Sequence, residues 1–152
     1  MYTAITPISF NLPLVRFKSI QPEIPSFEVG KSVTERYPVT DKFVVRDLFS
    51  DQIIHKVLAT PYVVGFMEST ARDWALSFLG KDKEIVGCKI NITHGSPALV
   101  GDEVQVTDTL IGKSSRFLTF KTLIRRLSDN KIVSKGEIVM SPVDKATWPP
   151  EK

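Results

Sequence analysis

The chain has 152 residues, of which 42% are hydrophobic, so it can build one well-packed domain but not two. Its single cysteine, Cys88, excludes an internal disulfide, and no apolar stretch approaches the roughly 18 residues that span a bilayer. The net charge is +3, but acids and bases are interspersed, which is not typical of a nucleic-acid-binding surface. We therefore expect an intracellular, cytoplasmic protein that binds neither membrane nor nucleic acid.

The first thirty residues contain four prolines, which remove backbone donors and exclude a helix. We predict an extended or irregular arm over residues 1–30 that packs against a domain of residues 31–145, followed by a short tail, residues 146–152. Residues 1–22 contain no acid and only two bases, Arg16 and Lys18. Organellar targeting by the arm remains an alternative, although the arginine enrichment of such segments is missing.

Residues 32–45 are rich in valine and aromatic residues but are interrupted by Pro38. This composition predicts either an edge strand or a strand with a break, because proline cannot donate to a strand ladder.

The clearest helix signal begins at Thr60 and Pro61, a hydroxyl residue able to cap followed by a proline suited to the first helical position. We expect a helix from Pro61 to Leu79, ended by Gly80. Apolar residues recur at intervals of three and four and predict one buried stripe formed by Val64, Met67, Ala71, Trp74, Ala75 and Phe78.

Four strand-like segments follow the helix, separated by turn residues, and the last three predict a meander. They cover residues 85–94, 103–111, 117–127 and 131–140. A single long helix followed by consecutive strands indicates an α+β fold in which an antiparallel sheet packs on the helix.

Glu68 lies four residues after Val64 and three before Ala71, so a helix that buries those residues turns Glu68 toward the sheet. A carboxylate there needs hydrogen bonds or a raised pKa, and both are common in catalytic acids and bases. The alternative is a slightly rotated helix with Glu68 at the wet edge of the stripe or paired with Arg72.

His94 ends a strand in which Val86, Cys88, Ile90 and Ile92 are expected to share one face, and His94 continues that face. An imidazole at a strand exit can transfer protons near neutral pH, but it can equally be a structural residue.

Thr60 is expected to cap the helix, although its hydroxyl could instead hold a water or attack a carbonyl. The free amides at a helix N-terminus can also stabilise a developing oxyanion.

These residues occur at specific intervals: Glu68 stands eight residues after Thr60, and His94 twenty-six after Glu68. Further positions complete the pattern, namely Ala59, Met67, Gly87, Thr93, Pro97, Val100 and Gly101. In these features the stretch from Val57 to Val106 resembles the fluoroacetyl-CoA thioesterase family of the hotdog superfamily.

This resemblance implies a hotdog fold, hydrolysis of an acyl-CoA and a homodimer whose joined sheet wraps the helices. It implies that Thr60, Glu68 and His94 are catalytic, that Gly87, Val64 and Met67 contact the substrate, and that no metal is bound. Coenzyme A enters only as part of the substrate, so no separate cofactor is expected. A preference for fluoroacetyl groups does not carry over, because acyl selectivity depends on the pocket walls.

One distance constrains the site: eight residues of ideal helix separate the Cα atoms of Thr60 and Glu68 by roughly 12 Å. Either the helix begins late, or two subunits share the site.

Two other functions remain open. A hotdog hydratase would use an aspartate and a histidine near the helix start, and Asp51 with His55, expected on an exposed connecting turn, are the only such pair. A non-catalytic acyl-thioester-binding protein would use the polar residues only for hydrogen bonding.

A thioesterase and an acyl-thioester-binding protein would both need to hold coenzyme A. Its phosphates could meet exposed bases, namely Lys113, Arg116, Arg125 and Arg126.

Overall fold

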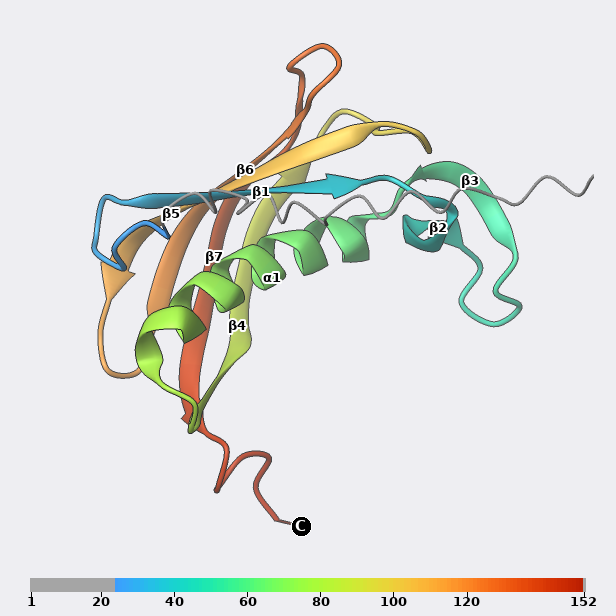
Figure 1. Ribbon diagram of the computed structural model, residues 1–152. Helices are drawn as coiled ribbons and strands as arrows, with labels where there is room; N and C mark the ends of the chain where they lie inside the picture. The colour runs from blue at the N-terminus through green and yellow to red at the C-terminus, as the bar shows by residue number, and fades with distance from the viewer. Residues whose placement is uncertain (1–23, 152) are drawn as a thin grey trace, which may run out of the picture.

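The computed structural model describes residues 24–151, in which one long helix packs on a five-stranded antiparallel sheet (Figure 1). The strands lie in the order β1-β5-β6-β7-β4, which leaves β1 and β4 at the edges. The elements are β1 (Ser32–Pro38), α1 (Thr60–Leu79), β4 (Lys83–His94), β5 (Glu103–Lys113), β6 (Leu118–Arg126) and β7 (Ile132–Asp144). The predicted α+β class, the break after Pro38 and the meander β5-β6-β7 are confirmed.

Most of the predicted arm, residues 1–23, lies outside the described residues. Its last part contacts the domain through the indole of Trp74, whose Nε1 donates a hydrogen bond to the carbonyl of Pro25 at 2.8 Å. Phe27 is buried and meets the Trp74 ring edge-on, with centroids 5.0 Å apart. The segment before β1 therefore closes one end of the core.

Helix α1 begins at Thr60, one residue before the predicted start, and ends where Gly80 adopts a φ of +92°. The predicted cap is wrong: Ala59 occupies the cap position, and no side chain caps the helix. The predicted stripe is also displaced at its ends. Val63 is buried where Val64 was expected, and Phe78 is 49% exposed. The helix face that the sheet covers is rotated slightly from the predicted one. Phe78 therefore lies outside this face and stacks on the ring of Phe27.

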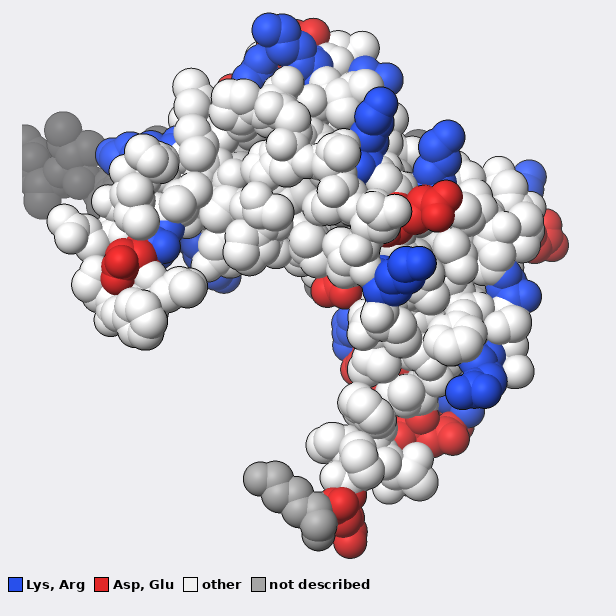
Figure 2. Space-filling model, turned by 180° about the vertical axis from the view of Figure 1, so that it is seen from behind, with Lys and Arg blue, Asp and Glu red and all other residues white. Residues whose placement is uncertain are grey.

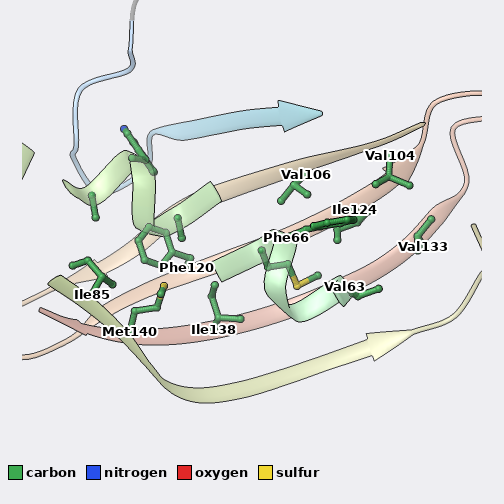
Figure 3. Packing of buried hydrophobic residues seen from close by; sticks show 14 of the residues in the cluster. Val63, Phe66, Ile85, Val104, Val106, Phe120, Ile124, Val133, Ile138 and Met140 are labelled. Carbon is green, nitrogen blue, oxygen red and sulfur yellow. The ribbon is translucent and has the colours of Figure 1, made fainter. Parts of the chain in front are cut away.

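The core fills the space between α1 and the inner face of the sheet (Figure 3). From the helix, Val63 and Phe66 point toward the sheet, where Val104, Val106 and Ile124 stand on β5 and β6. Near the other end, the core continues through side chains of β4, β6 and β7, namely Ile85, Phe120, Ile138 and Met140. This packing sets the rotation of α1 and with it the direction of every other helix side chain.

Strand β4 contains a bulge that changes which residues face the helix. Gly87 pairs with Met140 and Lys89 with Val139, so Cys88 is the extra residue between them. The prediction that Val86 and Cys88 share a face with Ile90 is therefore wrong. Five residues of β4, on both sides of the bulge, face α1, because each of them pairs with a residue on the helix-facing side of β7. They are Ile85, Gly87, Ile90, Ile92 and His94.

A hairpin that was not predicted precedes α1. It consists of β2 (Val44–Arg46) and β3 (Ile53–Leu58), follows a short 3₁₀ turn η1 (Asp41–Phe43), and extends beyond the end of the main sheet (Figure 1). His55 lies in β3 rather than in a turn, although it is exposed as expected. Two large apolar residues at the hairpin tip, Leu48 and Phe49, are 93% and 98% exposed.

The surface carries charges of both signs. Figure 2 shows Lys and Arg side chains scattered over one face of the molecule, with acidic groups and uncharged residues between them. Among the described residues, no helix has the length and apolarity needed to cross a membrane.

A buried carboxyl group lies under the helix. Asp108 on β5 has no exposed surface, and within residues 24–151 neither of its oxygens has a well-directed hydrogen bond; nor does the hydroxyl of Thr122, its cross-strand neighbour. Burial raises the pKa of Asp108 to about 7, and the nearby Thr122 hydroxyl and Ala71 amide offset only part of this effect. Asp108 is thus an acid for which charge in the folded state is unfavourable.

This carboxyl should make stability depend on pH. The pKa of Asp108 rises from 3.8 to about 7 on folding, so the unfolded chain ionises first and the folded protein loses stability as pH rises from about 4 to about 7. Asp108→Asn cannot ionise. The free energy of unfolding of this variant, minus that of the native protein, should therefore rise across this window by on the order of 4 kcal/mol.

Urea denaturation at several pH values measures this difference, in which contributions from all other groups cancel. Asp82→Asn, which replaces a carboxyl at an exposed position, is the matched control for the substitution itself. A flat difference for Asp108→Asn would show that Asp108 does not carry this pH dependence.

Candidate active site

Thr60 and His94 meet at one end of the helix. The Thr60 Oγ1 and His94 Nδ1 atoms are 2.9 Å apart, a hydrogen-bond distance between residues thirty-four positions apart in the chain. The Thr60 hydroxyl is available for this contact because it does not cap the helix. A hydroxyl beside an imidazole nitrogen is the arrangement in which a neutral histidine can accept the hydroxyl proton.

His94 is held at the end of β4 by the neighbouring strand. It pairs with Ser134 of β7, and the next residue, Gly95, donates its amide hydrogen to the Val133 carbonyl at 2.9 Å. Partial burial lowers the pKa of His94 below its usual value. A lowered pKa keeps the imidazole neutral at physiological pH, which is the form that accepts a proton.

Glu68 lies two turns further along α1, against Gly87 of β4. A Cβ atom built at Gly87 would stand 2.0 Å from Glu68 Oε1, so the carboxylate occupies the space that any side chain at position 87 would take. The closeness explains why glycine is required here, although its backbone needs no special conformation. The predicted orientation of Glu68 toward the sheet is therefore correct.

The Glu68 carboxylate has no ion-pair partner among the described residues. Burial raises its pKa, and no charged neighbour opposes that effect. The alternative pairing with Arg72 is not observed, since Arg72 instead donates two hydrogen bonds to Glu84, at 2.8 and 2.7 Å. A partly buried, unpaired carboxylate with a raised pKa is a stronger base than an exposed one.

One chain does not bring the three residues into direct contact. The helix begins at Thr60, so a late start cannot shorten the roughly 12 Å between the Thr60 and Glu68 Cα atoms. Along β4, Gly87 and His94 are roughly 20 Å apart. The chain thus holds two half-sites: a Thr60–His94 pair and a Glu68 carboxylate against Gly87.

A hollow and two apolar helix residues lie near these half-sites. A hollow of about 500 Å³ opens beside Thr60 and is lined by the β2–β3 hairpin and the start of α1, including Val44, Arg46 and Tyr62. Met67 is fully buried in the core, and Val64 is partly buried. This hairpin wall was not predicted, although the β-branched residues of β3 were a signal for a strand.

The pair considered for a hydratase does not form a site. Asp51 and His55 are both exposed on the hairpin, and the Asp51 carboxylate lies 3.7 Å from the Arg46 guanidinium. No group of three or more His, Cys, Asp or Glu side chains within residues 24–151 is placed to hold a metal ion.

The basic residues considered for phosphate binding mostly have partners within the chain. Lys113 donates to the Phe27 carbonyl, and Arg125 donates to the Asn130 carbonyl. Arg126 donates to Asp129 and to the Pro97 carbonyl. Arg116 lies over the ring of Phe117.

The fold is shared with thioesterases of known structure. A Thermus thermophilus member of the thioesterase superfamily is 23% identical, with a TM-score of 0.70 over 82% of this chain and 88% of that one. A fluoroacetyl-CoA thioesterase is 21% identical, with a TM-score of 0.74 over 82% and 93% of the two chains. A hot-dog-like protein from Thermanaerovibrio acidaminovorans is 18% identical, with a TM-score of 0.67 over 79% and 86%. The predicted hotdog fold is confirmed.

No curated protein sequence is significantly similar to this chain. Residues 39–146, more than two thirds of the sequence, match the fluoroacetyl-CoA-specific thioesterase family. That match includes both half-sites described above. The chain therefore belongs to the fluoroacetyl-CoA-specific thioesterase family, and its class of activity is thioester hydrolysis.

Proposed function

We propose that the protein hydrolyses an acyl-CoA to a free acid and coenzyme A, with Thr60, Glu68 and His94 as its catalytic residues. The observation that carries this proposal is the 2.9 Å contact between Thr60 and His94, together with an unpaired Glu68 carboxylate on the same face of the sheet. The family supports the reaction, and fluoroacetyl-CoA thioesterase structures solved with CoA or acetyl-CoA support the thioester class.

The chemistry assigns complementary roles to the two half-sites. In one route, water attacks the thioester carbonyl carbon while Glu68 takes its proton, the carbon–sulfur bond breaks, and this proton passes to the coenzyme A thiolate. In the other route, the Glu68 carboxylate attacks and forms a mixed anhydride as the thiolate leaves; water then cleaves the anhydride, which releases the acid, regenerates Glu68 and supplies the proton of the thiol. Thr60 positions the attacking group, and neutral His94 accepts the proton of the attacking water by way of the Thr60 hydroxyl and passes it to the thiolate.

The backbone amide of Gly87 stabilises the oxyanion, and the partly buried Val64 contacts the acyl group. Met67, which was also expected to contact the substrate, is fully buried in the core and supports this wall from behind.

A second copy of the chain would complete the site. Strand β4 is an edge strand, residues 87–91 are exposed, and Ile90 of the helix-facing side is 39% exposed. An exposed edge of this kind readily pairs with another strand. Antiparallel pairing about a two-fold axis that passes between the Asn91 residues of the two strands, with Cys88 bulged out of each strand, places Gly87, with its Glu68, opposite His94 of the partner subunit.

This arrangement also accounts for the exposed hairpin. Leu48 and Phe49 at its tip have no cover within the described residues, and a soluble monomer rarely leaves two such side chains together in water. In a homodimer, the hairpin and the hollow beside Thr60 lie near the shared site. Dimer formation is then a condition of activity.

Release of free thiol from short, medium, branched and aromatic acyl-CoAs tests the function. Glu68→Gln and His94→Ala should each lower turnover by more than about a hundredfold, because each removes a positioned acid–base group. His55→Ala, which changes the exposed histidine on β3, is the matched control and should retain full turnover. Tight acyl-CoA binding without turnover of any substrate would instead identify a binding protein.

Gly87→Ala tests the close approach between β4 and Glu68. The new methyl group must displace the Glu68 carboxylate, which lies at the end of a flexible side chain, so turnover should fall strongly while thermal stability changes little. Gly65→Ala on α1, where a Cβ meets nothing within 4 Å, is the control and should keep full turnover, with thermal stability raised slightly because alanine favours a helix interior. Unchanged turnover in Gly87→Ala would argue against a catalytic carboxylate at this place.

Hybrid dimers test whether two subunits share each site. Glu68→Gln and His94→Ala chains, co-expressed with different affinity tags, form hybrids in which one site has Glu68 from one chain and His94 from the other. Such hybrids should recover about half the native activity, since one of their two sites is intact. If each site lies within one chain, the hybrids will be as inactive as the parent variants.

A further inference from the structure

A charged side chain that could pair with Glu68 is held elsewhere. Arg72 follows Glu68 by four residues on α1, the spacing and order at which a glutamate and a following base pair well on a helix. In the structure its guanidinium points instead to the start of β4, where it meets Glu84. The helix therefore carries a potential counter-ion of Glu68 that does not reach it.

Glu84 holds Arg72 through two parallel hydrogen bonds. Arg72 Nε donates to one carboxylate oxygen at 2.8 Å, and Nη2 donates to the other at 2.7 Å. The backbone amide of Ile85 donates a third hydrogen bond to Glu84, at 2.8 Å. These donors, led by Arg72, lower the pKa of Glu84 to about 2, so it stays ionised and keeps its hold on Arg72 at any pH at which the enzyme would work.

The third nitrogen of the Arg72 guanidinium also has a partner. Its Nη1 lies 3.1 Å from a carboxylate oxygen of Asp73, the next residue on the helix. A planar guanidinium engaged in this way cannot turn toward Glu68 without breaking the paired hydrogen bonds to Glu84.

The groups around Glu68 leave it without a charged neighbour. On its own helix the only base within one turn is Arg72, and on β4 it faces Gly87, while the charged Lys89 points to the other side of the sheet. In the proposed dimer, His94 of the partner subunit is the titratable group on the facing side. The raised pKa of Glu68 is accordingly due to burial alone.

We propose that Glu84 is a positioning residue, which holds Arg72 at the start of β4 and so keeps the Glu68 carboxylate free of an ion pair. This inference rests on the proposed function, in which Glu68 is the catalytic carboxylate. An ion pair with Arg72 would stabilise the charged form of Glu68 and make it a weaker base and a weaker nucleophile. Glu84 acts only through Arg72 and touches no substrate.

The first experiment replaces Glu84 with glutamine, which has nearly the same shape but no charge. In Glu84→Gln, Arg72 is released to pair with Glu68. The titration of Glu68, followed by carbon-13 NMR of its labelled carboxyl group, should move to lower pH by about one unit. The acid limb of the kcat/KM profile should move in the same direction, with kcat at neutral pH reduced several-fold.

The double variant separates this effect from simple damage to the fold. Arg72→Met removes the released cation, so Glu84→Gln/Arg72→Met should restore the native titration of Glu68 and the native acid limb. Asp73→Asn, which alters another contact of Arg72 but leaves Glu84 intact, is the matched control and should change neither. If Glu84 only stabilised the fold, the double variant would be at least as impaired as Glu84→Gln.

Further outcomes overturn the inference. A Glu68 titration that is the same in Glu84→Gln as in the native protein would show that Arg72 does not move to Glu68. A shift to higher pH in Arg72→Met alone would show that Arg72 already acts on Glu68, and this test holds even if Glu84→Gln fails to fold. If the NMR titration shifts as expected but the kcat/KM profile does not, Arg72 is positioned as inferred, and the proposed catalytic role of Glu68 fails.

Discussion

The absence of a side chain at position 87 allows a carboxylate to lie between the helix and the sheet. Met67 and Ala71 are packed into the core and set the rotation of α1, and this rotation directs Glu68 toward β4. Only glycine leaves room there, since a Cβ atom would stand 2.0 Å from the carboxylate. The position of the Glu68 carboxylate therefore depends both on the core packing of the helix and on the glycine of β4.

The same packing divides the polar residues into two groups. The Thr60–His94 contact lies at the start of the helix, and the Glu68 carboxylate lies two turns away. Between them, the helix-facing side of β4 is apolar and open at the sheet edge, where Ile90 is partly exposed. In the proposed mechanism, a thioester carbonyl needs both groups. The geometry of one chain is thus suited to assembly across the β4 edge.

Much of this arrangement could be predicted from local patterns. The three- and four-residue spacing of α1 indicated that Glu68 turns toward the sheet, and alternation in β4 placed His94 on the face of Ile90 and Ile92, both as observed. The bulge at Cys88 was not predicted, although Gly87, an isolated glycine inside the strand, was a signal for one. The Thr60 cap was predicted wrongly, since the hydroxyl bonds to His94, which is distant in sequence.

Features that depend on long-range contacts were not predicted. Arg72 has an acidic residue four positions before it, but its partner is Glu84, which the chain brings near only when β4 pairs with the sheet. Asp108 looks like an ordinary polar residue in a strand, and only the helix above it makes the position fully buried. Local patterns thus predicted the direction of the side chains better than their partners.

The bulge in β4 has a consequence for finding relatives of this chain. Gly87 and His94 are an odd number of residues apart and would face opposite sides of a regular strand, yet the extra residue at Cys88 brings both to the helix side. A relative that lacks this residue would keep the same two side chains on the same face with a spacing shorter by one. Alignments and search patterns that allow no gap at this position would overlook such a protein, although its site would superpose on this one.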